Sequence, residues 1–380
     1  MKVAITRERA PEETRVAISP DTAKRLLGLG LEVMIESGAG AGARFSDSDF
    51  KSLGAGIGTS VEQTLKDANL VFKVGVPETE ELDAMPRGCA LVSTLSPYDH
   101  PELLADLASR GIDSFAMELM PRISRAQSMD VLSSQSNLAG YMAVVEAAAE
   151  SDSAMPMMMT AAGTIAPARV FVLGAGVAGL QAIATARRLG AIVSATDVRP
   201  AVKEQVESLG ANFVMVDSDE TESAETAGGY AKEMSDDYKR RQAELVEETL
   251  KKQDIVICTA LIPGRPAPVL VTQAMVESMQ PGSIIVDLAV ERGGNCPLSK
   301  PGEVVEHQGV KIMGHLNMPG RLAVDASRLY ARNLFNFMSP FVDSETGSVN
   351  IDWEDELVIG TCLTRNGEIV HANFKQEKNP

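Results

Sequence analysis

The stretch Arg169-Val170-Phe171-Val172-Leu173-Gly174-Ala175-Gly176-Val177-Ala178-Gly179 decides the fold that we expect. It joins an apolar strand to a G-x-G-x-x-G turn, and an alanine-rich helix follows as far as Leu189. Gly190 ends that helix, and a second apolar run closes on Asp197. A strand, a glycine turn, a helix and an acid in this order are typical of a dinucleotide-binding βαβ unit.

Each position of the glycine turn has a separate expected role. Gly174 permits the tight turn, and Gly176 lets the backbone approach a pyrophosphate at the helix N-terminus. Val177 begins the helix and is expected to contact the same nucleotide. Gly179 allows the helix to lie close to the strand.

The acid at the end of the second strand indicates which dinucleotide is bound. A carboxylate at Asp197 would accept hydrogen bonds from the adenosine ribose 2′-hydroxyl and repel a 2′-phosphate, which favours NAD(H) over NADP(H). Arg199 leaves NADP(H) as an open alternative, because a guanidinium two residues after Asp197 can accommodate the 2′-phosphate.

Composition limits the other possibilities. With 380 residues the chain is long enough for about two domains, and its net charge of −17 argues against binding nucleic acid or anionic lipid. The four cysteines show no paired spacing and no histidine has metal-ligand spacing, so we expect reduced thiols and no metal. We also expect neither a signal peptide nor a transmembrane segment.

The periodicity of apolar residues predicts an α/β fold with two Rossmann-like doubly wound domains, the first completed by the C-terminal tail. The expected N-terminal domain is 1–133 plus 320–380, and the expected NAD(H)-binding domain is 134–319. Strands expected in the first domain are 3–6, 32–36, 70–74, 90–93 and 112–116. Those expected in the second are 170–173, 192–196, 212–216, 255–260, 283–288 and 310–313.

Helices are expected between the strands, at 19–29 and 101–110 among others. The second glycine cluster, 38–42, is interpreted as a loop because no apolar helical pattern follows it. The tail is expected to form a helix over 323–337 and a short strand pair within 349–364, too little for a domain of its own.

Two polar segments are candidates for function. The insert 217–253 contains Gly228-Gly229-Tyr230 and is either a mobile lid or a plain solvated connection. The linker 118–137 carries many more hydrogen-bonding side chains than a spacer needs, so it is either part of a site between domains or a polar hinge.

A general acid or base is missing from the sequence. In the sequence, none of the four histidines stands beside a residue that marks it as a general acid or base, and His315, near the end of a strand, is either structural or catalytic. The absence of an acid–base pair favours hydride chemistry that moves no proton.

At these residues the chain closely resembles the NAD(H)-binding domain I of proton-translocating nicotinamide nucleotide transhydrogenases, over its whole length. The supporting segments are 118–141, 156–164, 174–197, 224–233, 259–264 and 287–291. The resemblance implies a Re/Si-specific NAD(P)⁺ transhydrogenase that is active only with its partner subunit, where hydride passes directly between NAD(H) and NADP(H).

The resemblance also implies the assembly. Domain I of that family is a homodimer, and the segment 155–168 resembles a hairpin that embraces the neighbouring subunit, with a methionine-rich core strand as the alternative. The implied partners are the NADP(H)-binding domain of a β subunit and a membrane-embedded proton-channel subunit. The chain itself would be cytoplasmic and attached to the inner membrane only through these partners.

Site residues follow from the resemblance position by position. Arg122, Gln127, Asp130 and Ser133 match the family's polar loop at the nicotinamide end, with Gln127 reaching toward the partner's nucleotide. Asp130 and Ser133 would bond the carboxamide. The remaining matches are Asp197 at the ribose, Tyr230 in the mobile loop and Leu261 in the nucleotide cleft. Arg199 and Gly229 are further candidate cofactor contacts.

The same architecture is shared with alanine dehydrogenase, which supplies the alternative function. Arg15 and Lys73 resemble that family's substrate-binding arginine and lysine, but its catalytic histidine falls near Ser96 and its later aspartate at Glu291. The alternatives are therefore an amino-acid dehydrogenase or an NAD(H)-sensing module without chemistry.

Overall fold

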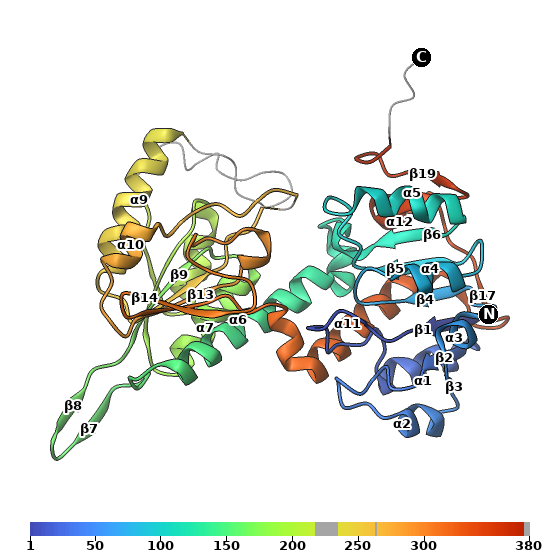
Figure 1. Ribbon diagram of the computed structural model, residues 1–380, viewed down its shortest axis with the longest axis horizontal. Coiled ribbons are helices and arrows are strands. Elements are labelled where there is room, and N and C mark those ends of the chain that lie inside the picture. Colours follow the sequence, from blue (N-terminus) through green and yellow to red (C-terminus); the bar gives the residue numbers. More distant parts are fainter. Residues whose placement is uncertain (217–234, 263, 376–380) are drawn as a thin grey trace. The chain divides into compact units, whose positions relative to one another are not determined.

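The computed structural model describes residues 1–216, 235–262 and 264–375. The chain divides into two compact units, and each is described here by itself. Unit 1 comprises Met1–Gln135 and Gly320–Pro380, and unit 2 comprises Ser136–Pro319. Each unit is built on its own central sheet (Figure 1).

Unit 1 contains an eight-stranded sheet in the order β19-β18-β6-β5-β4-β1-β2-β3. The strands β1 to β6 are parallel, whereas β18 pairs antiparallel with β6 and β19 with β18. The C-terminal tail therefore completes this sheet, as the sequence predicts. The strands are β1 Lys2–Ile5, β2 Glu32–Glu36, β3 Gly56–Gly58, β4 Leu70–Phe72, β5 Ala90–Ser93, β6 Asp113–Ala116, β18 Cys362–Arg365 and β19 Glu368–Ile369.

Local signals explain the ends of several helices of unit 1. Ser19 caps α1 with its side chain, and α5 ends at Gly111, which has a left-handed φ of 68°. Tyr330 and Phe337 on α11 are buried against the sheet. The helices are α1 Pro20–Gly28, α2 Asp47–Ser52, α3 Val61–Leu65, α4 Thr79–Ala84, α5 Pro101–Arg110, α11 Ala323–Met338 and α12 Glu356–Thr361.

Unit 2 contains a seven-stranded sheet in the order β11-β10-β9-β12-β13-β15-β14. Every pair is parallel except β14 with β15. The strands are β9 Arg169–Leu173, β10 Ile192–Thr196, β11 Asn212–Phe213, β12 Ile255–Cys258, β13 Ile284–Asp287, β14 Val304–His307 and β15 Val310–Met313. The helices of this unit are α7 Val177–Arg188, α8 Lys203–Ser208, α9 Asp236–Leu250, α10 Gln273–Glu277 and most of α6 Val131–Glu150, whose first turn belongs to unit 1.

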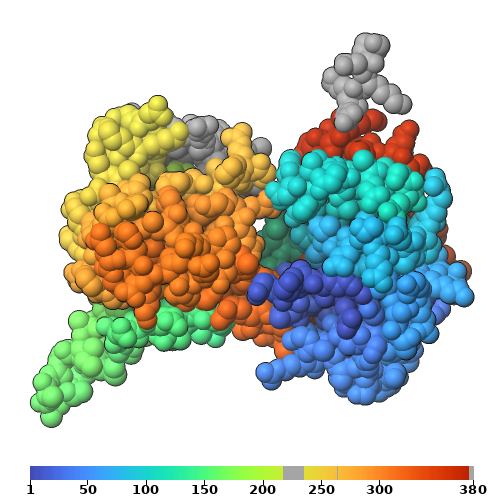
Figure 2. Space-filling view, viewed as in Figure 1, coloured from blue at the N-terminus to red at the C-terminus, as the bar shows by residue number. Residues whose placement is uncertain are grey.

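The methionine-rich segment forms a two-stranded hairpin, β7 Met158–Thr160 and β8 Gly163–Ile165. Met157 is 59% exposed and Met159 is 78% exposed, so the alternative of a core strand is wrong. Figure 2 shows this part of unit 2, in green, standing out from the surface.

Some elements differ from the prediction. The short strand β3, with glycines at both ends, and the antiparallel edge strand β14 were not expected from the pattern. Helix α6 begins at Val131, and the carboxylate of Asp130 caps it. The insert ends as the charged helix α9, and its centre lies outside the described residues.

Candidate nucleotide-binding site

The candidate site of unit 2 lies at the carboxyl ends of its parallel strands. Strand β9 has β10 on one side and β12 on the other, so the chain leaves β9 where the order of strands reverses. In open α/β sheets, ligands bind in the crevice outside the strand ends at this position. The turn 174–179 that follows β9 occupies it.

The surroundings of the three glycines differ. Gly174 has a φ of 100°, and an added Cβ would lie 2.7 Å from Oγ1 of Thr259. At Gly179, a Cβ would lie 1.9 Å from the carbonyl oxygen of Gly174, which makes the close approach of α7 to β9 possible only with glycine. A Cβ at Gly176 would meet nothing within 4 Å. The turn is therefore tight on the protein side and open at Gly176.

Helix α7 starts at this open position. Gly176 is its N-cap and provides no side chain to satisfy the first backbone N–H groups. Val177, the first residue of the helix, is 40% exposed. Unsatisfied N–H groups and the positive end of the helix dipole together favour an anion here.

Asp197 follows β10 and is tied to the glycine turn. It is only 8% exposed, and its Oδ2 accepts a 2.8 Å hydrogen bond from the backbone N of Ala175. Arg199 contacts the same carboxylate: Nε lies 2.9 Å from Oδ1 and Nη2 lies 2.8 Å from Oδ2. The guanidinium that the sequence offered to a phosphate is thus paired with the acid in this structure.

One wall of the site is held by a residue that the sequence reasoning missed. Asn295 is fully buried and brackets Ala260: Oδ1 accepts from its N at 3.1 Å and Nδ2 donates to its O at 2.9 Å. Nδ2 also donates to the carbonyl of Pro268 at 2.7 Å. Leu261, next in the chain, is 45% exposed. Only the glycine pair preceding Asn295 hinted at a special backbone there.

A second missed residue is Gly140 in α6. A Cβ there would lie 2.0 Å from the carbonyl oxygen of Ala178, within the first turn of α7. Helix α6 therefore crosses α7 directly beside the glycine turn. An isolated glycine inside a helical pattern is the signal that could have identified it.

In unit 1, Asp130 and Ser133 form the N-terminal cap of α6. The carboxylate of Asp130 accepts from the Ser133 backbone N at 2.9 Å and from its Oγ at 2.5 Å. The predicted carboxamide ligands are therefore close together and already hydrogen-bonded to each other. Arg122 lies on the surface of the same polar segment.

Gln127 is exposed on the 3₁₀ helix η2 Ser124–Met129, and this helix is fixed at both ends. Arg125 makes a two-pronged contact with Asp355 at 2.7 and 2.8 Å. That hydrogen bonding lowers the pKa of the Asp355 carboxyl below its usual range. Side-chain amides of Asn333 and Asn336 both donate to the carbonyl of Ser128, at 2.9 and 3.0 Å.

Lys73, which resembles a substrate-binding lysine of alanine dehydrogenase, is held by internal acceptors. Its side chain is 1% exposed, and Nζ lies 2.8 Å from Glu81 and 3.5 Å from Glu8. Arg15 is similarly engaged, by Glu13 at 2.6 Å and by Gln135 at 2.9 Å. A cation held in this way by internal acceptors is poorly placed to receive a free carboxylate.

The two positions that replace the catalytic pair of alanine dehydrogenase are also engaged through the backbone. Ser96 has a positive φ of 44°, and its N donates to Oε1 of Glu118 at 2.5 Å. Glu291 accepts from the backbone N of Asn317 at 2.7 Å.

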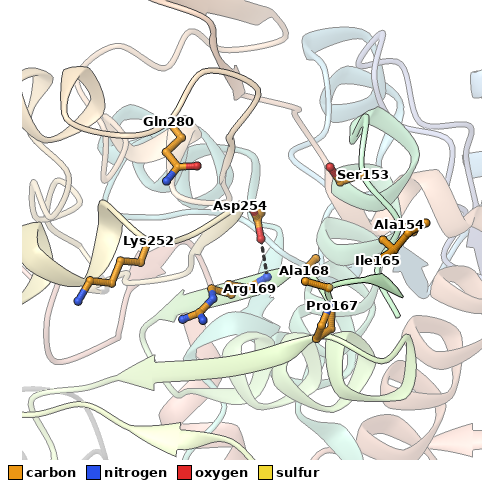
Figure 3. Close-up of a pocket in the computed structure, with 10 residues that line it drawn as sticks. Ser153, Ala154, Ile165, Pro167, Ala168, Arg169, Lys252, Asp254 and Gln280 are labelled. Carbon is orange, nitrogen blue, oxygen red and sulfur yellow. Dashed lines mark hydrogen bonds between the residues drawn. The ribbon is translucent and has the colours of Figure 1, made fainter. Parts of the chain in front are cut away.

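A separate cavity of about 560 Å³ lies in unit 2 (Figure 3). It is lined by Arg169 at the start of β9 and by Asp254 just before β12, whose carboxylate accepts from the Arg169 backbone N at 2.7 Å. It also reaches Ile165 in the hairpin. These are the amino ends of the strands, opposite the glycine turn, so this cavity is not the candidate nucleotide site.

Gly229 and Tyr230 lie outside the described residues. Within the described part of the chain, no group of three His, Cys, Asp or Glu side chains is arranged to hold a metal ion. None of the helices described there has the length and apolarity that crossing a bilayer requires.

Two family profiles match almost the whole chain. The N-terminal domain of alanine dehydrogenase/PNT matches residues 4–139, and the C-terminal domain of the same family matches 143–372. The chain belongs to the alanine dehydrogenase/PNT family. The resemblance and the fold class that the sequence predicts are thereby confirmed.

The similar proteins include both transhydrogenases and an alanine dehydrogenase. An NAD(P) transhydrogenase alpha-subunit chain of Rhodospirillum rubrum, named as the first part of that subunit, is 57% identical over 98% of each chain. The crystal structure of a transhydrogenase from Sinorhizobium meliloti is 52% identical, with a TM-score of 0.89 over 97% of this chain and 100% of that one. An L-alanine dehydrogenase structure is 25% identical, with a TM-score of 0.80 over 98% of each chain.

Proposed function

We propose that this member of the alanine dehydrogenase/PNT family is the NAD(H)-binding subunit of a proton-translocating transhydrogenase. The reaction is direct hydride transfer between NAD(H) and NADP(H) bound on a partner subunit. The observation that carries the proposal is the linked pair of glycine turn and acid: the carboxylate of Asp197 is bonded to Ala175 within the turn. The printed names of relatives at 57% and 46% identity support the same conclusion.

The described residues fit the cofactor. The space at Gly176 and the uncapped start of α7 suit a diphosphate, because nothing lies within 4 Å of the missing Cβ. Asp197 suits a ribose diol. When bound, the dihydronicotinamide ring supplies a hydride from C4, and the accepting ring becomes reduced as the donor becomes oxidised. No proton needs to move, so the reaction asks the protein for orientation rather than for acid or base.

The loop around Gln127 suits that requirement. Orientation demands groups that are held in place before the reaction, and η2 is held by Arg125–Asp355 at one end and by two amides on the Ser128 carbonyl at the other. We propose that Arg122, Asp130 and Ser133 bind the nicotinamide end, and that Gln127 sets the approach of the partner's ring.

The buried state of Lys73 argues against an amino-acid dehydrogenase. Such an enzyme needs cations free to bind the substrate carboxylate, whereas Lys73 and Arg15 are paired with Glu81 and Glu13. An NAD(H) sensor without chemistry would bind the same nucleotide, but it has no use for a rigidly anchored polar loop. Hydride transfer is the function that uses both features.

The partners follow from the proposal. We propose a homodimer that uses the exposed hairpin 155–168, docked on the NADP(H)-binding domain of a β subunit and associated with a membrane-embedded proton-channel subunit. The chain would then lie in the cytoplasm, attached to the inner membrane through these subunits. No nucleic acid is proposed as a partner, because the net charge is −17.

One assay separates the three functions. NADH and a chromogenic NADP⁺ analogue are mixed with the chain, with and without its NADP(H)-binding partner, and alanine with NAD⁺ serves as the control reaction. Transfer only in the presence of the partner is expected. Oxidation of alanine would indicate an amino-acid dehydrogenase, and NADH binding without any transfer would indicate a sensor.

Gln127→Asn tests the positioning role within that assay. Shortening the side chain by one methylene misplaces the rings by about 1 Å, which costs on the order of 100-fold in transfer rate. NADH affinity should change by no more than a few fold. Ser128→Ala is the matched control, because it alters the neighbouring side chain and leaves the anchored carbonyl in place. Equal rates for both variants would contradict the proposal.

A further inference from the structure

We propose that Arg199 is a specificity-determining residue that competes with the adenosine ribose for Asp197. The proposal rests on the NAD(H)-binding function given above and deepens it. In it, the guanidinium covers the ribose-binding carboxylate before the nucleotide arrives. Once displaced, the same guanidinium becomes the positive charge that a 2′-phosphate would meet.

The hydrogen bonds of Asp197 show how completely the carboxylate is used. Oδ1 accepts from the backbone N of Arg199 and from its Nε, both at 2.9 Å. Oδ2 accepts from the backbone N of Ala175 and from Nη2 of Arg199, both at 2.8 Å. A carboxylate offers about four acceptor positions, so all of them are filled.

A ribose diol brings two further hydroxyl donors to the same carboxylate. The N–H of Ala175 cannot leave, because it belongs to the glycine turn itself, and the backbone N–H of Arg199 is fixed by the chain. The guanidinium is the one group that can rotate away about side-chain torsions. It contributes two charge-assisted bonds, which is the number that the diol requires.

Competition of this kind makes Arg199 work in two directions. For NAD(H), it lowers affinity, because its bonds to Asp197 must be broken first. For NADP(H), it softens the repulsion between Asp197 and the 2′-phosphate, because a guanidinium binds phosphate well. The preference for NAD(H) should therefore be smaller than Asp197 alone would give.

The test compares Arg199→Gln with the wild-type chain. Adenosine carries the diol and no phosphate, so it reports the competition alone. Its affinity, followed by NMR titration, should rise by about three- to tenfold when the two charge-assisted bonds are gone. The ratio of NADH to NADPH affinity, measured by calorimetry, should widen by about tenfold or more.

Matched variants exclude trivial explanations. Arg188→Gln removes the same charge from the exposed far end of α7 and should leave adenosine binding and the NADH to NADPH ratio as in the wild type. Arg199→Lys keeps the charge but cannot span both carboxylate oxygens, so it should fall between wild type and Arg199→Gln. Arg199→Lys can also replace Arg199→Gln as the test variant if Arg199→Gln does not fold.

Unchanged or weaker adenosine binding in Arg199→Gln would overturn the proposal, because Arg199 would then support Asp197 rather than compete with it. A ratio that narrowed would overturn it as well. If the proposed NAD(H)-binding function itself were wrong, the results would differ from these. The wild type would then not bind NADH, and Asp197→Asn would not change the affinity for adenosine.

Discussion

The carboxyl ends of the two parallel sheets use the same architectural position in opposite ways. In unit 2, the end of β9 carries the glycine turn, with open space at Gly176 and free helix-dipole charge. In unit 1, the ends of β1 and β4 carry Glu8 and Lys73, which are buried and joined to Glu81. One strand end leaves the backbone donors of α7 without a side-chain cap, whereas the other pairs its own charged side chains. A shared fold therefore does not give a shared function.

Glu8, Lys73 and Glu81 form the closed strand end of unit 1, and they are also hydrogen-bonded to the backbone around them. Glu8 accepts from the N of Val74 at 2.8 Å and of Gly75 at 3.3 Å, so it holds the end of β4. Lys73 donates to the carbonyl of Arg7 at 3.2 Å, just after β1. Buried ions repay their desolvation only when such additional hydrogen bonds are made. The cluster should thus contribute to the stability of unit 1 and not to nucleotide binding.

Lys73→Met should produce the largest effect on this comparison. It leaves the buried carboxylate of Glu8 without its cation and Glu81 with Arg9 alone, 3.4 Å away, which costs about 3–5 kcal/mol of unfolding free energy. Urea unfolding followed by the fluorescence of Trp353, the single tryptophan of the chain and a residue of unit 1, measures the loss. Lys24→Met, at an exposed position of α1, is the control. Equal stability of both variants would contradict the role of the cluster.

Gly176→Ala should have the next largest effect, on NADH affinity at the open strand end of unit 2, the glycine turn after β9. The protein has room for the added methyl group, so its stability should not change. A bound diphosphate, however, would leave no room for that methyl group. NADH affinity should fall by about 100-fold, because the methyl group stands where the backbone must approach the phosphate. Gly28→Ala also adds a methyl group with nothing within 4 Å, in unit 1, and should leave affinity intact. If calorimetric titration found the same NADH affinity for both variants, the turn would not be the site that binds the phosphates.

Sequence alone predicted the open strand end well because each of its signals is local. The run 169–197 contains the strand, the turn, the helix and the acid, and all of them form where they were expected. The antiparallel edge strand β14 was missed, because its pairing with β15 has no counterpart in the parallel pattern.

The buried cluster of Glu8, Lys73 and Glu81 could not be predicted, because its members are distant in the sequence. Lys73 follows β4 as an apparently available cation, but Glu8 and Glu81, which bury it, come from the end of β1 and from α4. Asn295 and Gly140 escaped for the same reason: each acts on a segment at least 27 residues away. The pairing of Arg199 with Asp197 is local but depends on side-chain rotation, which no spacing rule specifies.

Gly140→Ala should have a smaller effect that connects α6 to the open strand end. The new methyl group would overlap the carbonyl of Ala178, so α6 and the first turn of α7 must separate, at a cost of about 1–3 kcal/mol. Part of this cost should appear as NADH affinity weakened by about threefold to tenfold, since the glycine turn moves with α7. Asn137→Ala, at an exposed site on α6, is the matched control. Unchanged NADH titrations for Gly140→Ala would separate α6 from the site.

The smallest expected effect is the pH dependence of the closed strand end. Burial raises the pKa of Glu8 above its ordinary 4.5, partly opposed by Lys73. A carboxyl with a raised pKa contributes stability that is present below the unfolded pKa and lost as pH rises through the folded one. The stability of the wild type, relative to Glu8→Gln, should therefore decline as pH rises from about 4.5 through the raised pKa of Glu8.

Trp353 fluorescence during urea unfolding at a series of pH values measures that difference. Glu62 provides the opposite sign in the same unit, because a hydrogen bond from Ser60 lowers its pKa. Glu62→Gln should therefore lose its disadvantage against the wild type on acidification, whereas the advantage of Glu8→Gln should grow as pH rises. Two parallel pH profiles would mean that Glu8 is not held in a closed site, and the distinction between the two strand ends would then rest on Lys73 alone.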